Sequence, residues 1–280
     1  MEELSILNPN DILFFKKNGY FIARNIYSIN EIKSLRNIFD SWFDRQIWKN
    51  NWSDSESIIN DIYTHEPEIA KILFNQKYFD VIKDLLGKEL IFLPECAIHK
   101  NRFIDWHKDT TSQEKEGHDF HKGDKNCFLQ CAIYLQDNGV NGGGLTVIPG
   151  TQKNEDRFLA FHRPNILNRI YLKILKMLNH SVHRNIEKNE NVIDLDTRTG
   201  DILLFDLRID HRSTFCRSKD NNHKTKYAVF NTFGNVHSNI KKYQDFLRSR
   251  PEPYYRFINQ HILPDVVYSK AIEYGVEVYY

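Results

Sequence analysis

Short runs of apolar and β-branched residues, separated by turn-forming residues, dominate the chain from Gly87 to about residue 235. The runs that we expect to form strands are 90–100, 106–109, 127–135, 145–148, 192–194, 201–205 and 227–233. This rhythm is typical of an all-β barrel or sandwich, because a parallel βαβ sheet would place a helical pattern between successive strands. Pro94 interrupts the first run and predicts a sheet edge or a bulge, since proline has no amide hydrogen to donate.

Helical patterns precede this β region. The predicted helices are 8–18, 28–43, 54–64 and 67–86, with a short strand at 20–23 between the first two. Asn8 followed by Pro9 is a typical helix start, and Ser28 with Glu31 forms a capping box for the second helix. Gly87 ends the last helix. We expect these helices to pack on the outside of the sheet.

One domain of 280 residues therefore accounts for the chain. It consists of a helical N-terminal region (residues 1–88), a β core (about 89–235) and a C-terminal extension (236–280). A further amphipathic segment at about 165–180 interrupts the core. Three roles are open for it: packing on the barrel, closing as a lid over an apolar substrate, or meeting a partner or membrane surface.

The net charge and the apolar runs of the sequence restrict which partners the protein can bind and which cellular compartment it can occupy. The net charge of +1, with no basic stripe interleaved with aromatic residues, argues against binding to nucleic acid. The N-terminus lacks a basic, apolar signal peptide, and no run of about 20 apolar residues could span a bilayer. The four cysteines form no C-x-x-C pair and are expected to be buried free thiols. We therefore predict a cytoplasmic protein without an integral membrane segment.

The segment Trp106–Asp109 contains a pattern that can bind a metal ion. On an extended backbone, residues two apart point to the same side, so His107 and Asp109 can offer one nitrogen and one oxygen to one ion. His211 is the best candidate for a third ligand. Two histidines and one carboxylate form the facial triad of non-heme Fe(II) oxygenases. Taken alone, a His-x-Asp pair is weak evidence for a metal site, because a surface histidine beside a solvated aspartate on an edge strand is the more common arrangement.

Other histidines are open to several interpretations. His99 shares one face of its predicted strand with Glu95 and Ala97. These inward polar groups either satisfy one another in the core or contact a substrate or cofactor. His118 and His121 lie in a polar loop predicted at 110–126, which could bind zinc or border a substrate entrance.

Several motifs, taken in their order along the chain, resemble one enzyme family. They are Asn18–Tyr20, Trp106–Asp109, Asn141–Gln152, Gly200–Phe205 and His211–Ser213. With the flanking helices, they make the chain similar to the phytanoyl-CoA dioxygenase family of Fe(II)- and 2-oxoglutarate-dependent oxygenases, over about residues 7–235. The resemblance implies a double-stranded β-helix, also called a jelly roll or cupin-like fold, with helices packed outside. It also implies ferrous iron held by His107, Asp109 and His211, with 2-oxoglutarate as cosubstrate and O2 as oxidant.

The residues expected to hold 2-oxoglutarate depart from the family pattern. The family normally places an arginine, at the start of the last long strand, against the distal carboxylate of the cosubstrate. Here Lys226 aligns with that position after a short insertion, and Arg217 is the competing cation. An ordinary solvated lysine at a strand edge is the alternative role for Lys226. A lysine supplies a point charge in place of a bidentate fork. Ser213 matches a family position that often hydrogen-bonds the cosubstrate, and His99 is a further candidate for cofactor binding.

The resemblance implies an enzyme that hydroxylates a small organic metabolite and releases succinate and CO2. The carboxylate at Asp109 argues against halogenation, because halogenating relatives carry a small residue at that position. Desaturation or cyclisation at the same iron is an alternative outcome. A catalytically silent jelly-roll protein that binds or senses a ligand is the alternative outside the enzymes.

Overall fold

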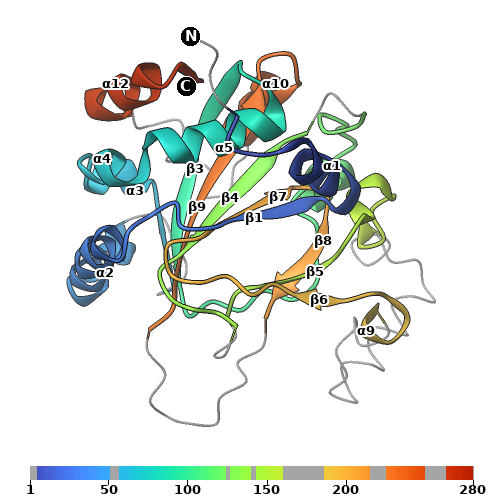
Figure 1. Ribbon diagram of the computed structural model, residues 1–280, viewed down its shortest axis with the longest axis horizontal. Coiled ribbons are helices and arrows are strands. Elements are labelled where there is room, and N and C mark those ends of the chain that lie inside the picture. Colours follow the sequence, from blue (N-terminus) through green and yellow to red (C-terminus); the bar gives the residue numbers. More distant parts are fainter. Residues whose placement is uncertain are drawn as a thin grey trace.

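Two β-sheets face each other in the computed structural model of this protein, with helices on the outer side of the larger sheet (Figure 1). The structure describes residues 5–50, 57–123, 127–139, 143–159, 186–214, 225–249 and 263–279. This arrangement agrees with the predicted mainly β core and its outer helices.

The larger sheet has seven strands in the order β1-β7-β4-β9-β3-β10, with β2 also paired to β3. Its strands are β1 (Tyr20–Ala23), β2 (Ile58–Asn60), β3 (Leu90–Lys100), β4 (Leu129–Tyr134), β7 (Ile202–Asp206), β9 (Tyr227–Asn235) and β10 (Val276–Val278). Its neighbours pair antiparallel except for β10, which runs parallel to β3. The register of β3 against β9 shifts between Leu93 and Cys96, which confirms the bulge predicted from Pro94.

The smaller sheet has three strands in the order β6-β5-β8. They are β5 (Leu145–Ile148), β6 (Ile193–Asp194) and β8 (Asp210–Ser213). An isolated bridge joins His107 to His211 on the free edge of β8. The predicted strand at 106–109 is therefore reduced to this single bridge, and the local extended backbone is held by β8.

Successive side chains along the strands of the large sheet point to opposite faces and pack in two different hydrophobic clusters. On β4, Cys131 and Ile133 point outward into the helical layer, whereas Ala132 and Tyr134 point inward towards the small sheet. The outer face is covered by α2 (Ile29–Asp44), α3 (Ile62–His65), α4 (Ile69–Leu73), α5 (Gln76–Leu86) and α12 (Asp265–Glu273). The inner face is thus left for the space between the sheets.

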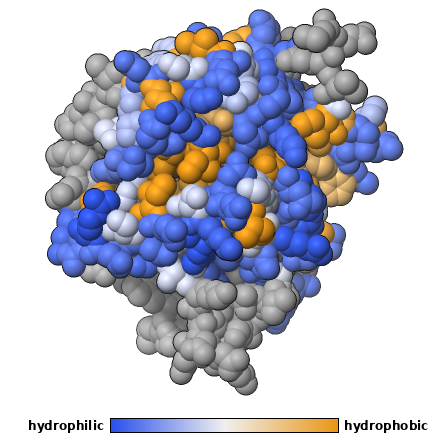
Figure 2. Space-filling model, turned by 60° about the vertical axis from the view of Figure 1, so that its left-hand side comes forward, coloured by the Kyte–Doolittle hydropathy of each residue, from blue (hydrophilic) through white to orange (hydrophobic). Residues whose placement is uncertain are grey.

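The predicted caps set the helix starts. Asn8 accepts hydrogen bonds from two amides of α1 (Pro9–Asn18), and Gly19 ends that helix in the left-handed conformation. Ser28 and Glu31 form the predicted capping box of α2. The remaining helices are η1 (Ile47–Asn50), α6 (Thr111–Lys115), η2 (Thr151–Lys153), α9 (Ile186–Asn189) and α10 (Ile240–Ser249). Figure 2 shows one face of the molecule, largely hydrophilic with hydrophobic residues gathered near its middle.

Some predicted elements were wrong. The predicted helix 54–64 contains strand β2, whose Ile58 and Ile59 pair with His99 and Ile98, followed by the short helix α3. The predicted helix 67–86 is two helices, α4 and α5, and the predicted loop 110–126 contains α6. The segment 165–180 and Arg217 lie outside the described residues. Within the described chain, no helix is both long and apolar enough to cross a membrane.

Candidate metal centre

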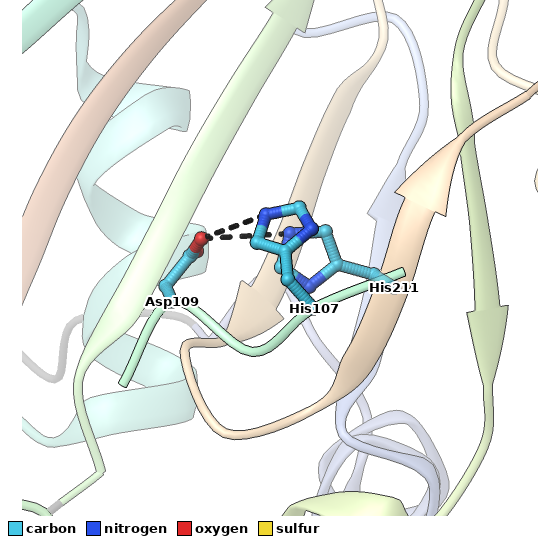
Figure 3. Close-up of side chains that lie close together, drawn as sticks. All are labelled: His107, Asp109 and His211. Atoms are coloured by element: carbon cyan, nitrogen blue, oxygen red, sulfur yellow. Dashed lines mark ion pairs between the residues drawn. The ribbon is translucent and has the colours of Figure 1, made fainter. Parts of the chain in front are cut away.

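The structure brings His107, Asp109 and His211 together at the inner edge of the small sheet (Figure 3). Oδ1 of Asp109 lies 3.4 Å from Nε2 of His107 and 3.5 Å from Nε2 of His211. One potential ligand atom from each residue lies within 4.8 Å of the others. Among the described residues, this is the one group of three or more histidine, cysteine or acidic side chains that meets this criterion.

Backbone hydrogen bonds fix the two segments that carry these side chains. The amide of His107 donates to the carbonyl of His211 (2.9 Å), and the reverse bond measures 3.0 Å. The amide of Asp109 donates to the carbonyl of Leu207 (3.0 Å), so the turn that follows His107 is held to the loop between β7 and β8. The triad therefore depends on pairing between segments about a hundred residues apart.

The hydrogen bonds of the two Nδ1 atoms determine whether the Nε2 atoms of His107 and His211 can act as metal ligands. Nδ1 of His107 lies 2.7 Å from the carbonyl oxygen of Asp105, and Nδ1 of His211 lies 3.0 Å from that of Ile209. A carbonyl oxygen only accepts, so each Nδ1 carries the proton and each neutral Nε2 directs a lone pair towards Asp109. Three acceptors then face one point, and a divalent cation between them removes the repulsion. This donor set, with two imidazoles and one carboxylate, fits ferrous iron.

The charge states of the metal-free centre follow from the same contacts. Burial lowers the pKa of His107, but the hydrogen bond and charge of Asp109 outweigh this effect and leave that pKa raised. Burial and the neighbouring His107 lower the pKa of His211 to about 4. Burial raises the pKa of Asp109, yet the two histidines reverse this and hold the pKa below its usual value.

A buried ionic cluster lies behind the triad. Nζ of Lys108 donates to the carbonyls of Thr151 and Asn154, both at 2.9 Å, and lies 3.6 Å from Oδ1 of Asp210. Arg157 approaches the other oxygen of Asp210, with Nε to Oδ2 at 2.9 Å. Lys108 stands between two triad residues and Asp210 precedes the third. The cluster therefore joins both ligand-bearing segments to η2, a connection that sequence reasoning missed.

A cavity of about 570 Å³ opens beside the triad, between the two sheets. His107, Asp109 and His211 all line it, and the side chains of the first two are 28% and 29% exposed, so the ligand atoms can be reached from the cavity. The ring of Phe205 lies 5.0 Å from that of His211 and gives the cavity an apolar wall beside the triad. Its size is that of a typical small-molecule site.

Lys226 and Ser213, the residues predicted to hold the cosubstrate, both line this cavity. The stem of Lys226 lies over Gly143, where φ is +83° and an added Cβ would collide with the lysine side chain. The amide of Lys226 donates to Oδ1 of Asn101 (2.8 Å), which fixes the start of β9. Oγ of Ser213 accepts from the amide of Ile104 (3.0 Å), so the hydroxyl hydrogen can be donated to a ligand. Arg217, the competing cation, is not among the described residues.

His99 lines the cavity, with its ring 4.8 Å from that of Phe230. Burial, assisted by Arg102, lowers the pKa of His99 to about 3, so the imidazole is neutral near pH 7. Glu95 and Ala97 line the same cavity, which confirms that the three residues share one face. By contrast, Nε2 of His121 lies 2.8 Å from Oε1 of Glu114, and the ring of His118 stacks on Phe120, so neither joins the triad.

Among the cavity residues that were not singled out from the sequence are Gln130 and Tyr134 on β4 and Tyr243 on α10. Gln130 and Tyr134 are four positions apart on one face of β4, so alternation would have found them once the inward face was known. Tyr243 comes from the C-terminal extension, and no sequence pattern links it to the β core.

Residues 15–223 match the family model described as phytanoyl-CoA dioxygenase (PhyH). No curated protein matches the chain by sequence.

Several solved structures share the fold. EctD from S. alaskensis in its apo form has a TM-score of 0.60 at 16% identity, over 85% of this chain and 80% of EctD. HygX from Streptomyces hygroscopicus, solved with nickel and 2-oxoglutarate, has a TM-score of 0.56 at 13% identity, over 82% of this chain and 88% of HygX. AviO1 from Streptomyces viridochromogenes Tue57 has a TM-score of 0.57 at 12% identity, over 84% of this chain and 98% of AviO1. These similarities confirm the predicted jelly-roll core.

Proposed function

Since the chain belongs to the phytanoyl-CoA dioxygenase family and is thus a 2-oxoglutarate-dependent dioxygenase, we propose that it hydroxylates a small organic metabolite. The observation that carries this proposal is the convergence of His107, Asp109 and His211 on one point in the wall of a 570 Å³ cavity. The cofactors are ferrous iron, 2-oxoglutarate and O2. When bound, they supply an oxidant for C–H bonds, and 2-oxoglutarate leaves as succinate and CO2.

The three triad residues hold the iron in this proposal. The carbonyls of Asp105 and Ile209 keep the Nδ1 protons in place, so that both Nε2 atoms remain available as ligands. Phe205, whose ring lies beside that of His211, and Leu145 both line the cavity and limit the access of water to the reacting atoms.

The 2-oxoglutarate lies, in this proposal, between the triad and the end of the cavity that carries Lys226. The ammonium of Lys226 pairs with its distal carboxylate, and the hydroxyl of Ser213 donates a hydrogen bond to the same group. Gly143 leaves the space that the lysine stem occupies. Neutral His99 contributes a hydrogen bond without adding charge to the site.

The first prediction tests the triad directly. His107→Ala and Asp109→Ala should each abolish ferrous iron uptake and 2-oxoglutarate turnover, because two remaining ligands cannot hold the ion. Metal content and succinate release measure the two effects. His237→Ala is the matched control, because His237 pairs with Glu89 on the surface (2.6 Å) and does not line the cavity. Full turnover in either triad variant would refute the assignment.

The reaction outcome has its own measurement. Once a substrate is oxidised, a product that is one oxygen atom heavier supports hydroxylation. A product that has lost two hydrogen atoms supports desaturation or cyclisation at the same iron.

The second prediction concerns Lys226. Lys226→Met should raise the KM for 2-oxoglutarate by about 10-fold or more, since the distal carboxylate would lose its cation, while iron uptake stays unchanged. Steady-state succinate release and metal content measure these quantities. Lys241→Met, at an exposed pair with Glu277, is the control for removing one lysine charge. An unchanged KM in Lys226→Met would assign the cosubstrate carboxylate to another cation.

A further inference from the structure

Gln130 brings an amide group to the cavity from the middle of the large sheet, where β4 lies between β7 and β9. It is the half-buried residue of β4, and the other five residues of that strand are buried. The outward side chains Cys131 and Ile133 pack under the helical layer, whereas Gln130 and Tyr134 line the cavity. The exposed part of the Gln130 side chain therefore faces the cavity.

The amide of Gln130 has one atom engaged and one atom available. The hydroxyl of Thr232, directly opposite on β9, donates to Oε1 of Gln130 (2.8 Å). This contact is shorter than the 3.4 Å between the same hydroxyl and Oε2 of Glu95, so the hydroxyl hydrogen is directed to Gln130. Among the described residues, none accepts a hydrogen bond from Nε2 of Gln130. Because an amide nitrogen donates and does not accept, Gln130 offers the cavity a donor of fixed orientation.

Two sets of contacts place this donor beside the metal centre. Gln130 lies directly opposite Phe205 on β7, and the ring of Phe205 lies 5.0 Å from that of His211. The amide of Leu207 bonds to the backbone two residues before Gln130, and the carbonyl of Leu207 accepts from the amide of Asp109. A ligand that contacts Gln130 is therefore next to the residues that flank the triad.

The proposed cosubstrate site leaves this donor open. Thr232 stands six positions after Lys226, a separation of about 20 Å along an extended strand. Gln130 pairs with Thr232, so it lies far along the sheet from the lysine that is proposed to hold the distal carboxylate. The five carbons of 2-oxoglutarate bridge only part of this separation. The donor of Gln130 is therefore available to a second molecule.

We infer that Gln130 determines substrate specificity, and that the substrate carries a carbonyl-type oxygen, in a ketone, amide, ester or carboxylate, that accepts from Nε2 of Gln130. This inference rests on the proposed function, because it concerns the molecule that the enzyme oxidises. A carbonyl oxygen only accepts and Nε2 only donates, whereas an amine at this place would set one donor against another. A site with a positioned donor rejects analogues that lack the acceptor. Phe205 gives the adjoining carbon skeleton an apolar surface that leads to the triad.

Binding to the complete enzyme tests the inference. The protein is loaded with ferrous iron and 2-oxoglutarate without O2, and ligand-observed NMR measures the affinities of benzamide, benzoate and benzylamine. Gln130→Met removes the donor, so the affinity for benzamide, benzoate or both should fall about 5- to 10-fold. The affinities for benzylamine and 2-oxoglutarate should stay within about twofold of the wild type. A larger loss for benzoate assigns a carboxylate to the substrate, and a larger loss for benzamide assigns a neutral carbonyl.

A second variant reverses the chemistry of the site. Gln130→Glu keeps an acceptor for the Thr232 hydroxyl but replaces the donor with a carboxylate oxygen, so benzylamine should gain affinity while benzamide loses it. Gln46→Glu is the matched control, because Gln46 is exposed and does not line the cavity. It makes the same change and should leave all three affinities as in the wild type. Melting temperatures check that each variant is folded.

Three results separate failure of the inference from failure of the proposed function. Benzamide and benzoate that do not bind the wild type, or that both bind Gln130→Met equally tightly, would overturn the inference while iron and 2-oxoglutarate still bind. A loss of 2-oxoglutarate affinity in Gln130→Met would assign Gln130 to the cosubstrate and would overturn it as well. A wild-type protein that binds neither iron nor 2-oxoglutarate would overturn the proposed function itself.

Discussion

At the scale of single residues, the metal centre depends on side chains that touch no ligand. Lys108 and Asp210 are almost fully buried, with side chains 2% and 1% exposed, and they flank the triad on both of its segments. Burial lowers the pKa of Lys108 against the opposing charge of Asp210. Burial also raises the pKa of Asp210 to about 6, against the opposing charges of Lys108 and Arg157. Burying the ammonium of Lys108 or the carboxylate of Asp210 therefore destabilises the fold unless the opposite charge lies beside it.

The third prediction follows from this dependence. Lys108→Met should lower the free energy of unfolding by about 2–4 kcal/mol, because Asp210 and two carbonyls lose a buried partner. It should also weaken ferrous iron binding by about 10- to 100-fold, since both ligand-bearing segments lose their attachment to η2. Chemical denaturation and metal competition measure the two effects.

A second variant separates charge from packing at this cluster. Lys108→Met combined with Asp210→Asn removes both charges, so it should recover part of the lost stability. If Lys108→Met alone left both stability and iron affinity unchanged, Lys108 would have no positioning role.

At the scale of elements, β9 connects the helical layer to the cavity. Its outward residue Asn231 is fully buried, accepts from the hydroxyl of Tyr63 on α3 (3.0 Å) and donates to that of Tyr78 on α5 (3.1 Å). Its inward neighbour Thr232 contacts Gln130 and Glu95. The helices α3 and α5 thus set the position of the strand that carries a section of the cavity wall.

The fourth prediction tests this connection. Asn231→Ala should destabilise the protein by about 2–4 kcal/mol, because two buried tyrosine hydroxyls each lose a hydrogen-bond partner. Tyr63→Phe removes one of these two hydrogen bonds together with the hydroxyl that donates it. This variant should lower the free energy of unfolding by only about 1 kcal/mol. Urea denaturation of both variants measures the difference. Equal costs would show that the second bond, to Tyr78, contributes nothing.

At the scale of the whole molecule, both ends of the chain join the same core. Strand β10 extends the large sheet beside the start of β3, and Val267 of α12 packs in the cluster that contains Leu35 of α2. Figure 1 shows α12 beside the helices of the N-terminal region. We therefore continue to predict one domain over residues 1–280, in which the helical N-terminal region is not a separate unit.

The fifth prediction is that the protein unfolds in one transition. Circular dichroism and tryptophan fluorescence should give coincident curves, because the outer face of the sheet and the helices share one apolar core. A chain that begins at residue 89 should aggregate, since Cys131, Ile133 and Val229 would lose their cover. Two separate transitions would instead divide the chain into independent units.

The amino-acid sequence by itself determined the features that depend on neighbours along the chain. Asn8, Ser28 and Gly19 are caps whose partners lie within four residues, so α1 and α2 begin as predicted. The strand rhythm after Gly87 likewise reflects local alternation between buried and exposed positions. The spacing of His107 and Asp109 placed both side chains on one side of the backbone.

Only the tertiary structure decided the features that depend on pairing between distant segments. Ile58 and Ile59 form a strand because β3 offers them hydrogen bonds, and no local pattern distinguishes them from a helix. Tyr243 reaches Glu95 because α10 folds back over the end of β3, and Lys226 faces the cavity because Gly143 leaves room for it. Periodicity fixes which way a side chain points within its own element, whereas long-range packing fixes what stands opposite it.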